Sequence, residues 1–478
     1  MKFLPSLLCL LVFLLISGCA NYQKDLQHFD TLYYNQDPAK AYKFSQKFAN
    51  NSLLWGIQNG VSGFMSGDYQ QSLQTLDSAE NTLDKNQAQG IFASSLDNTG
   101  ATLFNDNIKS YHGNIYEGIL INYYKALDAL LCDDLSRARV EFNRANDRQR
   151  RAKEYYQKEI QKAIQADLNA NKDKQEMLSN NTDTNASEKK INNILDKQYS
   201  NLKNFQSYTD FINPLVSYVS GLFFSLQGDP KGIDLLKESY GINHSSIIGT
   251  DILSFQGNPN KNKPHTWIII EDGQSPLKEE LTLQLPLILL NGESYFFMLA
   301  LPQLKDGKSF YTNFQLEGKS TQNFEEISVF DGVIANEFSK QLPYILTRAI
   351  LSASYKAYMQ SLLYQTAGNI GGLLGVVFSA ITTSADTRIT SVFPHKAWLA
   401  KISNDTKNIT LRGDGRDIFS FELITCPQDT TPLSSPQDPS QPIATKDGFK
   451  ICKNTNNVLY VRTTKNNIIP KLLIGEKL

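Results

Sequence analysis

The sequence offers few residues whose types and spacing would support catalysis. His265 and Trp267 lie in an apolar, strand-like run, but no partnered nucleophile can be placed beside this histidine, and a structural role is the simpler interpretation. The chain has no GxSxG nucleophile elbow, no GxxxxGKS or GxxxxGKT phosphate loop, no HExxH zinc motif and no GxGxxG after a strand. The sequence therefore predicts a protein that is not an enzyme and has no metal or cofactor site.

Three other charged positions suggest specific contacts. Glu117 lies within an apolar helical segment, and Asp386 and Arg388 follow a glycine-rich stretch. A fold-stabilising ion pair or hydrogen bond explains each of them at least as well as catalysis does. The run DGRD at residues 414–417 lacks the later acidic residues of a calcium-binding loop, so it predicts a β-turn.

Cys19 is the residue with the clearest chemistry. Lys2 precedes an apolar run over residues 3–16, which is too short to span a bilayer comfortably and ends in the small residues that a signal peptidase requires. The segment LISGC at residues 15–19 resembles the lipobox of bacterial lipoprotein precursors, whose cysteine thiol becomes diacylglycerylated. We therefore expect residues 1–18 to be a lipoprotein signal peptide and Cys19 to carry lipid. An ordinary secretory signal with an incidental cysteine is the alternative.

The expected lipid also indicates a location. Two or three acyl chains, at ~0.8 kcal/mol per buried methylene, anchor a protein stably in a membrane. Ala20 follows the cysteine where retention in the inner membrane would call for an aspartate, so we expect an outer-membrane protein that faces the periplasm. The net charge of −1 provides no field to attract nucleic acid, and export argues against a nucleic-acid partner independently.

Cleavage before Cys19 would leave three cysteines as protein thiols. Cys426 and Cys452 enclose a short Pro/Ser/Gln-rich stretch, and in an oxidising compartment they could form a disulfide. Two separate thiols are the alternative. The third cysteine is Cys132. The chain is long enough for two or three domains with a substantial buried core.

Three stretches of the chain share one pattern: an apolar helical segment, a turn that contains aspartate and a second, amphipathic helical segment. Each first segment contains a small residue that would allow the second helix to approach closely: Gly60, Ala126 and Gly221. The aspartate of each turn can cap the helix that follows. Counted from the turn, the inward positions of the second helices would be Ser72, Leu76 and Ala79; Ala138, Phe142 and Ala145; and Ile233, Lys237 and Tyr240.

This pattern is typical of tetratricopeptide repeats, in which paired helices stack into a curved surface. The third copy is weak, because Lys237 stands where an aromatic residue is expected. Generic antiparallel helical hairpins are the alternative. We expect repeats over residues 38–166 and another helical hairpin over residues 207–250. Residues 167–206 are rich in Asn, Asp, Lys and Gln and predict a polar linker or a frayed helix end.

The second helix of the middle copy has a seam of residues three and four apart that continues to Tyr156. Basic residues accompany this seam: Arg144, Arg148, Arg150, Arg151 and Lys153. Asp147 and Glu154 interrupt them. A solvated helix face is preferred to a functional basic patch.

After residue 250 the pattern changes to strands. Apolar or alternating runs predict strands at residues 265–270, 281–290, 295–301, 409–411, 419–423 and 458–461. A helical pattern interrupted by Pro343 covers residues 331–364. Residues 251–478 are therefore predicted to form a mixed α+β domain. The fold class of the whole chain is α+β, with a helical repeat domain followed by this C-terminal domain.

Residues 366–382 are apolar and glycine-rich with GxxxG spacing, which suggests a transmembrane helix. The run is short for a span and its start is polar. A buried hinge, or a helix packed tightly on the sheet, is the preferred interpretation.

Several short motifs point to one family when they are taken together. They are Asn105-Asp106-Asn107 with Tyr111 and Glu117, Tyr124-Lys125-Ala126-Leu127, Ala138-Arg139-Val140-Glu141 with Arg144-Ala145-Asn146, Asn213-Pro214 with Tyr218, Ser220-Gly221-Leu222, Glu271-Asp272-Gly273 and Ala385-Asp386-Thr387-Arg388. The set resembles the poorly characterised bacterial lipoproteins with tetratricopeptide-like repeats that are often encoded beside the lipoprotein activator of penicillin-binding proteins. Thr390 stands where that family usually has tryptophan. The resemblance implies an envelope location, a repeat architecture and a cell-wall neighbourhood, but no activity.

The expected function is that of a membrane-anchored scaffold or adaptor for a protein or peptide partner in the cell envelope. A link to cell-wall assembly is part of this expectation. Residues 19–37 would be the lipidated tether, and the concave side of the repeats would hold an extended partner. The candidate binding residues are Tyr69, Tyr111, Tyr116, Tyr123 and Tyr124, with core packing as the alternative for each. Two other functions stay open: an envelope hydrolase with a site around His265 or Asp386, and a membrane-inserted component of a secretion or motility complex.

Overall fold

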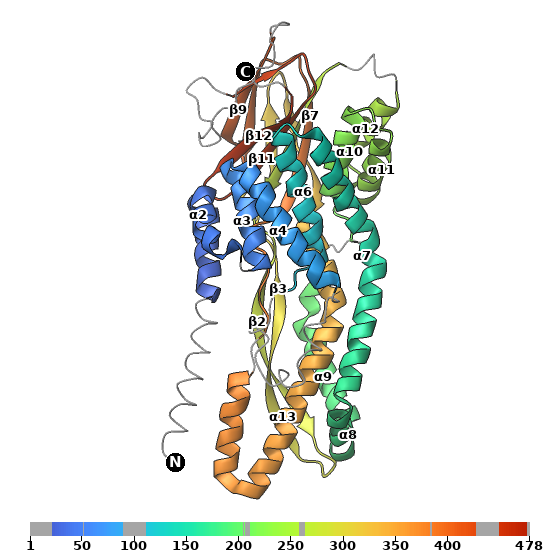
Figure 1. The fold of residues 1–478 in the computed structure, drawn as a ribbon, viewed down its shortest axis with the longest axis vertical. Helices are drawn as coiled ribbons and strands as arrows, with labels where there is room; N and C mark the ends of the chain where they lie inside the picture. Colours follow the sequence, from blue (N-terminus) through green and yellow to red (C-terminus); the bar gives the residue numbers. More distant parts are fainter. Residues whose placement is uncertain are drawn as a thin grey trace.

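The computed structural model describes residues 22–50, 52–88, 111–203, 205, 211–257, 263–382, 385–426 and 449–475, without the side chains of residues 363–382. Helices dominate the first half of the chain and strands the second, so the α+β class is confirmed. Figure 1 shows an elongated molecule, with two sheets at the end marked C and a long hairpin of strands beside long helices at the other.

The first half is built from helices. Residues 22–35 form the first described helix. After it come α2 (Pro38–Ala49), α3 (Leu53–Ser66), α4 (Tyr69–Ala88), α6 (Ile115–Leu131), α7 (Leu135–Ala170), α8 (Lys172–Asn181), α9 (Thr184–Gln198), η3 (Ser200–Lys203), α10 (Pro214–Leu226), α11 (Lys231–Asn243) and α12 (Ser246–Gln256). Phe29 and Tyr33 of the first helix are fully buried. The predicted tether over residues 19–37 is therefore wrong from residue 22 onward, because these apolar side chains dock the helix into the core.

The hairpins α3–α4, α6–α7 and α10–α11 share one turn geometry. A left-handed residue lies at the end of each first helix, with φ of 91° at Gly67, directly after α3. The second residue after α6, Asp133, has φ of 60°, and the second residue after α10, Gly228, has φ of 71°. The next backbone N–H then donates to the carbonyl five residues earlier, from Asp68 to Gly63 at 3.1 Å and from Asp134 to Ala129 at 2.8 Å. Asp229 makes the same bond to Phe224, also at 2.8 Å. This Schellman geometry satisfies the carbonyls at the end of each first helix.

Two of the three small residues in the first helices, Gly60 and Gly221, lie where the second helix approaches closely. A Cβ added to Gly60 would lie 2.5 Å from side-chain atoms of Leu76. One added to Gly221 would lie 2.9 Å from the backbone nitrogen of Leu236 and 3.0 Å from the carbonyl oxygen of Gly232. Absence of a side chain at these positions therefore sets the spacing of the helices.

The third hairpin differs from the predicted register by one residue. Its inward residues are Gly232, Leu236 and Ser239, all buried, whereas Lys237 and Tyr240 are exposed. The N–H of Gly232 bonds the carbonyl three residues earlier, at Asp229, whereas Ser72 and Ala138 bond carbonyls four residues earlier. This tighter first turn uses one residue fewer, which explains the shift of one residue between the predicted and the observed inward positions.

Residues 167–206, predicted as a linker or frayed helix, instead form the end of α7 and the helices α8, α9 and η3 over most of their length. Ser187, Ile191 and Leu195 repeat every four residues and are buried. α9 packs along β2 (Leu277–Ile288). The prediction was wrong because one narrow apolar stripe is enough for a helix that has a sheet to cover.

The strands form two five-stranded sheets and one hairpin. They are β1 (His265–Asp272), β2 (Leu277–Ile288), β3 (Ser294–Lys305), β4 (Phe314–Glu317), β5 (Thr321–Asn323), β6 (Glu325–Val329), β7 (Lys396–Ser403), β8 (Asn408–Gly413), β9 (Arg416–Ile424), β10 (Phe449–Cys452), β11 (Asn457–Thr463) and β12 (Ile468–Ile474). The first sheet has the order β12-β11-β1-β7-β6 and the second β10-β9-β8-β4-β5, while β2 and β3 pair with each other.

The first sheet lies between the helices and the second sheet. Alternate residues of β1 belong to different cores: Trp267 and Ile269 join the core shared with the helices, and Ile268 and Ile270 the core between the sheets. Both faces of the strand are therefore buried. The helical and sheet regions share one continuous core, so the predicted boundary near residue 250 does not separate two independent cores.

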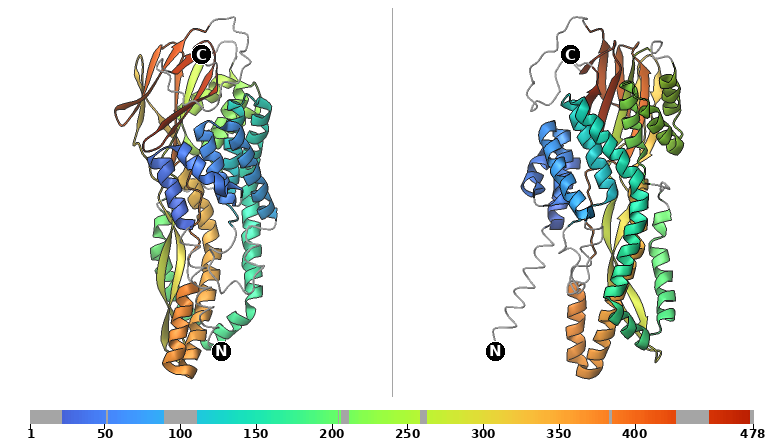
Figure 2. Two further views of the ribbon diagram at one scale, coloured as in Figure 1. Left: turned by 60° about the vertical axis from the view of Figure 1, so that its left-hand side comes forward. Right: turned by 45° about the vertical axis from the view of Figure 1, so that its right-hand side comes forward.

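The long helix α13 (Phe330–Thr382) runs along β3 and α7. The predicted helix over residues 331–364 is confirmed, and it continues to residue 382. Figure 1 shows α13 in orange, turning back on itself at the end of the molecule away from the sheets. Figure 2 shows the same hairpin-like bend from two other sides. Among the described helices, none is both long and apolar enough to cross a bilayer.

Candidate functional site

Of the five candidate tyrosines, Tyr116, Tyr123 and Tyr124 are buried, and Tyr69 and Tyr111 are partly buried. Tyr123 and Tyr124 of α6 are fully buried, and their hydroxyls donate to the carboxylate of Glu271 in β1 at 2.9 and 2.7 Å. The hydroxyl of Tyr460 in β11 donates to the same carboxylate at 2.8 Å. Burial raises the pKa of Glu271, and the charge of Arg462 and the three hydroxyls act against this rise.

Arg462 completes this buried cluster from the neighbouring strand. Its guanidinium is fully buried and donates to the carbonyl oxygens of Glu271 and Gly273, at 3.0 and 2.7 Å. It therefore supplies positive charge beside the Glu271 carboxylate and also fixes the turn that follows β1. A buried charge with such partners is a structural device that holds the end of the strand in place.

The other candidate tyrosines are also engaged inside the protein. Tyr111 donates to Glu117 at 2.6 Å, and Tyr69 accepts a hydrogen bond from Lys471 at 3.1 Å. Tyr116 is only 2% exposed. The prediction that these side chains line an open groove is wrong for Tyr116, Tyr123 and Tyr124, because the first helices turn that face toward the first sheet.

The chain itself covers the inner face of the helices. Residues 385–395 run between α13 and β7, and Val392 donates its N–H to the side chain of Gln58 in α3 at 3.1 Å. The same glutamine donates to Ser391 at 2.9 Å. Thr390 donates to Glu117 in α6. An internal segment thus occupies the place that the sequence assigned to a partner peptide.

The polar pair Asp386–Arg388 lies in this same segment. The guanidinium of Arg388 makes two bonds to the carboxylate of Asp386, at 2.8 and 2.7 Å. Although burial acts to raise the pKa of Asp386, the bonds and charge of Arg388 lower it. The carboxylate is then held ionised by its own neighbour, which suits an ion pair better than a proton-transfer catalyst.

His265 lies elsewhere, at the start of β1. Its ring is half-buried and 6.0 Å from the ring of Trp267. Burial and the nearby charge of Lys401 lower the pKa of this histidine. Lys401 and Trp267 both donate to Asp251, which is fully buried, at 2.7 and 3.0 Å. The residues around His265 are therefore Trp267 and Lys401, whereas Asp386 pairs with Arg388. The two predicted residues do not share one site.

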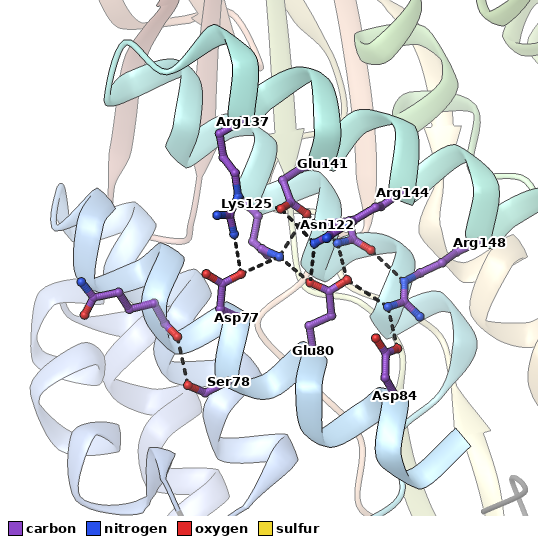
Figure 3. A network of polar contacts seen from close by, with 11 residues as sticks. Asp77, Ser78, Glu80, Asp84, Asn122, Lys125, Arg137, Glu141, Arg144 and Arg148 are labelled. Atoms are coloured by element: carbon purple, nitrogen blue, oxygen red, sulfur yellow. Dashed lines mark hydrogen bonds and ion pairs between the residues drawn. The ribbon is translucent and has the colours of Figure 1, made fainter. Parts of the chain in front are cut away.

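The densest polar network joins α4, α6 and α7 (Figure 3). At its centre is Lys125, whose side chain is fully buried although it stands in an apolar helix. Its ammonium nitrogen lies 2.7 Å from Asp77 and 3.0 Å from Glu141, and it also bonds Glu80. The ammonium is thus surrounded by carboxylates from both neighbouring helices.

These carboxylates have the spacing of metal ligands. Oxygens of Asp77, Glu80 and Glu141 lie within 4.8 Å of one another. The ammonium of Lys125 already contacts all three and supplies the positive charge that a cation would bring. Burial acts to raise the pKa of Glu80, but hydrogen bonds from Lys125 and Asn122 hold it at about 2. The cluster therefore cross-links helices.

Part of the predicted solvated basic face belongs to this network. Arg148 donates to Glu80 at 3.0 Å and to Asp84 at 2.7 Å, and Arg144 lies 3.3 Å from Glu141. The charges of Arg144 and Arg148 are compensated, so this part of the face is not an open basic patch. A lysine in the middle of the apolar run Tyr124-Lys125-Ala126-Leu127 is the sequence signal that could have indicated the network.

Two further polar contacts were not predicted. The carboxylate of Glu337 in α13 accepts the backbone N–H groups of Ile115 and Tyr116, at 2.8 and 3.0 Å, and so caps α6. Burial raises the pKa of Glu337 to about 7. His395 lies 2.6 Å from Asp331, which also accepts the N–H of Gly307 at 2.8 Å. Both contacts join residues distant in sequence, which no local spacing reveals.

The structure describes three of the five cysteines. Cys426 and Cys452 form a disulfide with Cα atoms 5.5 Å apart, beside the paired strands β9 and β10. Cys132, at the end of α6, is partly exposed and is not in a disulfide. Cys19 lies outside the described residues, so its predicted lipidation stays a prediction.

Comparison with known proteins adds no relative to these observations. No protein-family model and no curated protein matches the chain, and no solved structure matches its fold.

Proposed function

We propose that this protein is a lipid-anchored scaffold or adaptor of the bacterial envelope, attached through Cys19 to the outer membrane and facing the periplasm. The lipobox at residues 15–19 supports the anchor. The three hairpins with one turn geometry, and the close helix contacts at Gly60 and Gly221, support tetratricopeptide-like repeats. A cell-wall neighbourhood follows from the family resemblance alone.

The partner would bind outside the concave face of the repeats, because residues 385–395 and the first sheet already fill that face. The observation that carries this proposal is an apolar surface on the β2–β3 hairpin. Leu290, Phe296 and Met298 are 65%, 61% and 48% exposed. Phe296 and Met298 are two residues apart on β3, so their side chains share one face of the hairpin.

This surface is suited to a protein partner. The opposite face of the hairpin contributes Leu285, Leu299 and Leu301 to the core, so the ribbon is held firmly. The end of β2 is hydrogen-bonded to the connection between α8 and α9. The backbone N–H of Asp183 donates to the carbonyl oxygen of Ile288 at 2.8 Å. Figure 1 places this turn at the end of the molecule away from the sheets. Exposed aromatic and thioether side chains on a rigid ribbon are typical anchors of an interface.

Site-specific photocrosslinking in cells tests the proposal. A photoreactive residue at position 296 or 298 should give one discrete crosslinked product in the membrane fraction. Leu253 of α12, which is 72% exposed, is the matched control for an exposed apolar position and should give no such product. Equal products at all three positions, or none at positions 296 and 298, would contradict the assigned surface. Loss of the product in Cys19→Ser would show that binding needs the anchor.

A further inference from the structure

The connection between Cys19, the proposed lipidation site, and the folded body is shorter than the predicted tether of residues 19–37. The helix over residues 22–35 begins three residues after Cys19 and is packed by Phe29 and Tyr33. Three residues span at most about 11 Å. Whatever surface surrounds Tyr22 must therefore lie close to the membrane that holds the lipid, and its chemistry decides how the body lies there.

The helix α2 is part of this surface. Trp55 contacts both the first helix and the C-terminal end of α2. The ring centroid of Tyr22 is 6.1 Å from that of Trp55. Phe48, at the end of α2, stacks on the same ring at 4.7 Å. Figure 1 shows α2 at the outer edge of the helical region, on the side opposite α7 and α12.

One face of α2 is exposed and basic. Lys40, Lys43 and Lys47 are all exposed, and their spacing of three and four residues aligns them over a row of about 10 Å. They lie opposite the buried residues Ala41 and Tyr42. α2 contains no acidic residue. Among the described carboxylates, none lies within ion-pair distance of these three lysines, unlike Lys125, Arg137 and Arg148 in the network of α4, α6 and α7.

Aromatic side chains flank this basic row. The ammonium of Lys47 lies 4.6 Å from the ring centroid of Phe44 and 4.5 Å from that of Phe48. Both rings are half-buried. A row of lysines beside partly exposed aromatic rings is the composition by which helices lie on the headgroups of anionic phospholipids.

We propose that the outer face of α2, defined by Lys40, Lys43 and Lys47, docks on anionic phospholipid headgroups of the leaflet that carries the lipid anchor. This inference rests on the proposed lipidation of Cys19. It adds an orientation: the body lies on its side against the membrane, with α2 parallel to the surface. The positive lysines complement the negative headgroups, and the short connection from Cys19 to Tyr22 keeps α2 near the membrane. Both observations favour phospholipid over a protein partner at this face.

The experiment uses the full lipidated protein, purified from membranes and reconstituted into vesicles. Mass spectrometry of the peptide that begins at Cys19 first establishes the lipid. A membrane-impermeant amine reagent then measures the reactivity of each lysine in phosphatidylglycerol-containing vesicles and in pure phosphatidylcholine vesicles. We expect Lys40, Lys43 and Lys47 to react about fivefold more slowly with the anionic lipid. About 0.5 M salt should remove this protection, because it screens exposed charges.

Lysines on α8 and α9 provide the matched control. Lys172, Lys189 and Lys190 are exposed and should react equally in both vesicles. Docking should also slow the hydrogen exchange of α2 in anionic vesicles. Replacing Lys40, Lys43 and Lys47 by Gln should abolish this slowing, whereas replacing the three control lysines by Gln should preserve it. Equal reactivity of the α2 lysines in a protein that carries lipid would overturn the docking and leave the anchor intact. Absence of lipid on Cys19 would instead overturn the proposed function.

Discussion

The hydroxyl of Tyr124 lies 2.7 Å from a carboxylate oxygen of Glu271, and this bond ties the helix α6 to the strand β1. The two residues are 147 positions apart in the sequence. Because Tyr123 and Tyr460 donate to the same carboxylate, the bonds of Glu271 span the interface between the helices and the first sheet. The helical and sheet regions should therefore unfold together.

Removal of one hydroxyl from this cluster should destabilise the whole protein. Tyr124→Phe leaves the ring in place but deprives the buried Glu271 carboxylate of a donor, at a cost of about 1–3 kcal/mol in the free energy of unfolding. Urea denaturation followed by circular dichroism and by tryptophan fluorescence would measure it. Tyr240→Phe at a 40% exposed position should change stability by less than about 0.5 kcal/mol. Two separate transitions in the wild type would contradict the single unit.

Loss of the central cation should disrupt the network of α4, α6 and α7. Lys125→Met leaves Glu80 and Glu141 facing each other without their ammonium, so we expect about 3–5 kcal/mol of destabilisation. Combining it with Glu141→Gln should recover part of this loss. Denaturant titrations of the single and double variants give the coupling energy. Lys158→Met, at an exposed position on α7, is the control, and an equal effect there would rule out a special role for Lys125.

Glu337 should contribute a pH-dependent term to stability. Its pKa is raised from 4.5 to about 7 by burial, so the folded state binds its proton more tightly than the unfolded state does. This contribution is full below pH 4.5 and is lost as the pH rises toward 7, by up to about 3 kcal/mol. The stability of Glu337→Gln should therefore fall less between pH 5 and pH 8 than that of the wild type. Parallel stability curves across this range would show that the carboxyl titrates normally.

The close contact at Gly221 predicts a contrast between two glycines. Gly221→Ala would place a Cβ 2.9 Å from the backbone nitrogen of Leu236, which cannot move without separating α10 from α11. We expect a loss of roughly 1–3 kcal/mol. Gly241→Ala, in α11 with no atom within 4 Å of the added Cβ, should instead stabilise the protein by about 0.5–1 kcal/mol. Thermal denaturation distinguishes the two variants, and effects of the same sign would contradict the assigned helix contact.

The disulfide between Cys426 and Cys452 closes a loop with a sequence separation of 26 residues. Cys426→Ser with Cys452→Ser should lower the free energy of unfolding by about 3 kcal/mol, chiefly through the greater freedom of the unfolded chain. A reducing agent should lower the stability of the wild type by a similar amount and leave the double variant unchanged. Sensitivity of the double variant to the reductant would assign the effect to another group.

Local features of the sequence predicted local structure well. The strand at residues 265–270, the helix over residues 331–364 and the small residues Gly60 and Gly221 all have counterparts in the structure, because turn chemistry and periodicity act over a few residues. The register of α11 differed by one residue, since the closing of its first turn depends on bonds that composition does not reveal.

The polar interior depended on the tertiary structure. An isolated tyrosine in an apolar helix can be a binding anchor or a core residue, and only the distant Glu271 decides that Tyr123 and Tyr124 are internal. Likewise, the burial of Lys125 is explained only by Glu80 and Glu141, which lie on other helices and pair with its charge. Such contacts join elements that are far apart in the chain, and no spacing rule connects them.

By itself, the sequence determined the expected lipid anchor at Cys19, the turns of the three hairpins and the α+β class, because each depends on residues that are neighbours in the chain. Only the tertiary structure decided that the inner face of the helical hairpins is filled by residues 385–395 and the first sheet. It also decided that the helix over residues 22–35 is packed into the core, so the outer face of α2 would lie close to the proposed anchor. The physical reason is that a helix face can be buried by any apolar or hydrogen-bonding partner. Which partner buries it is a property of the whole fold.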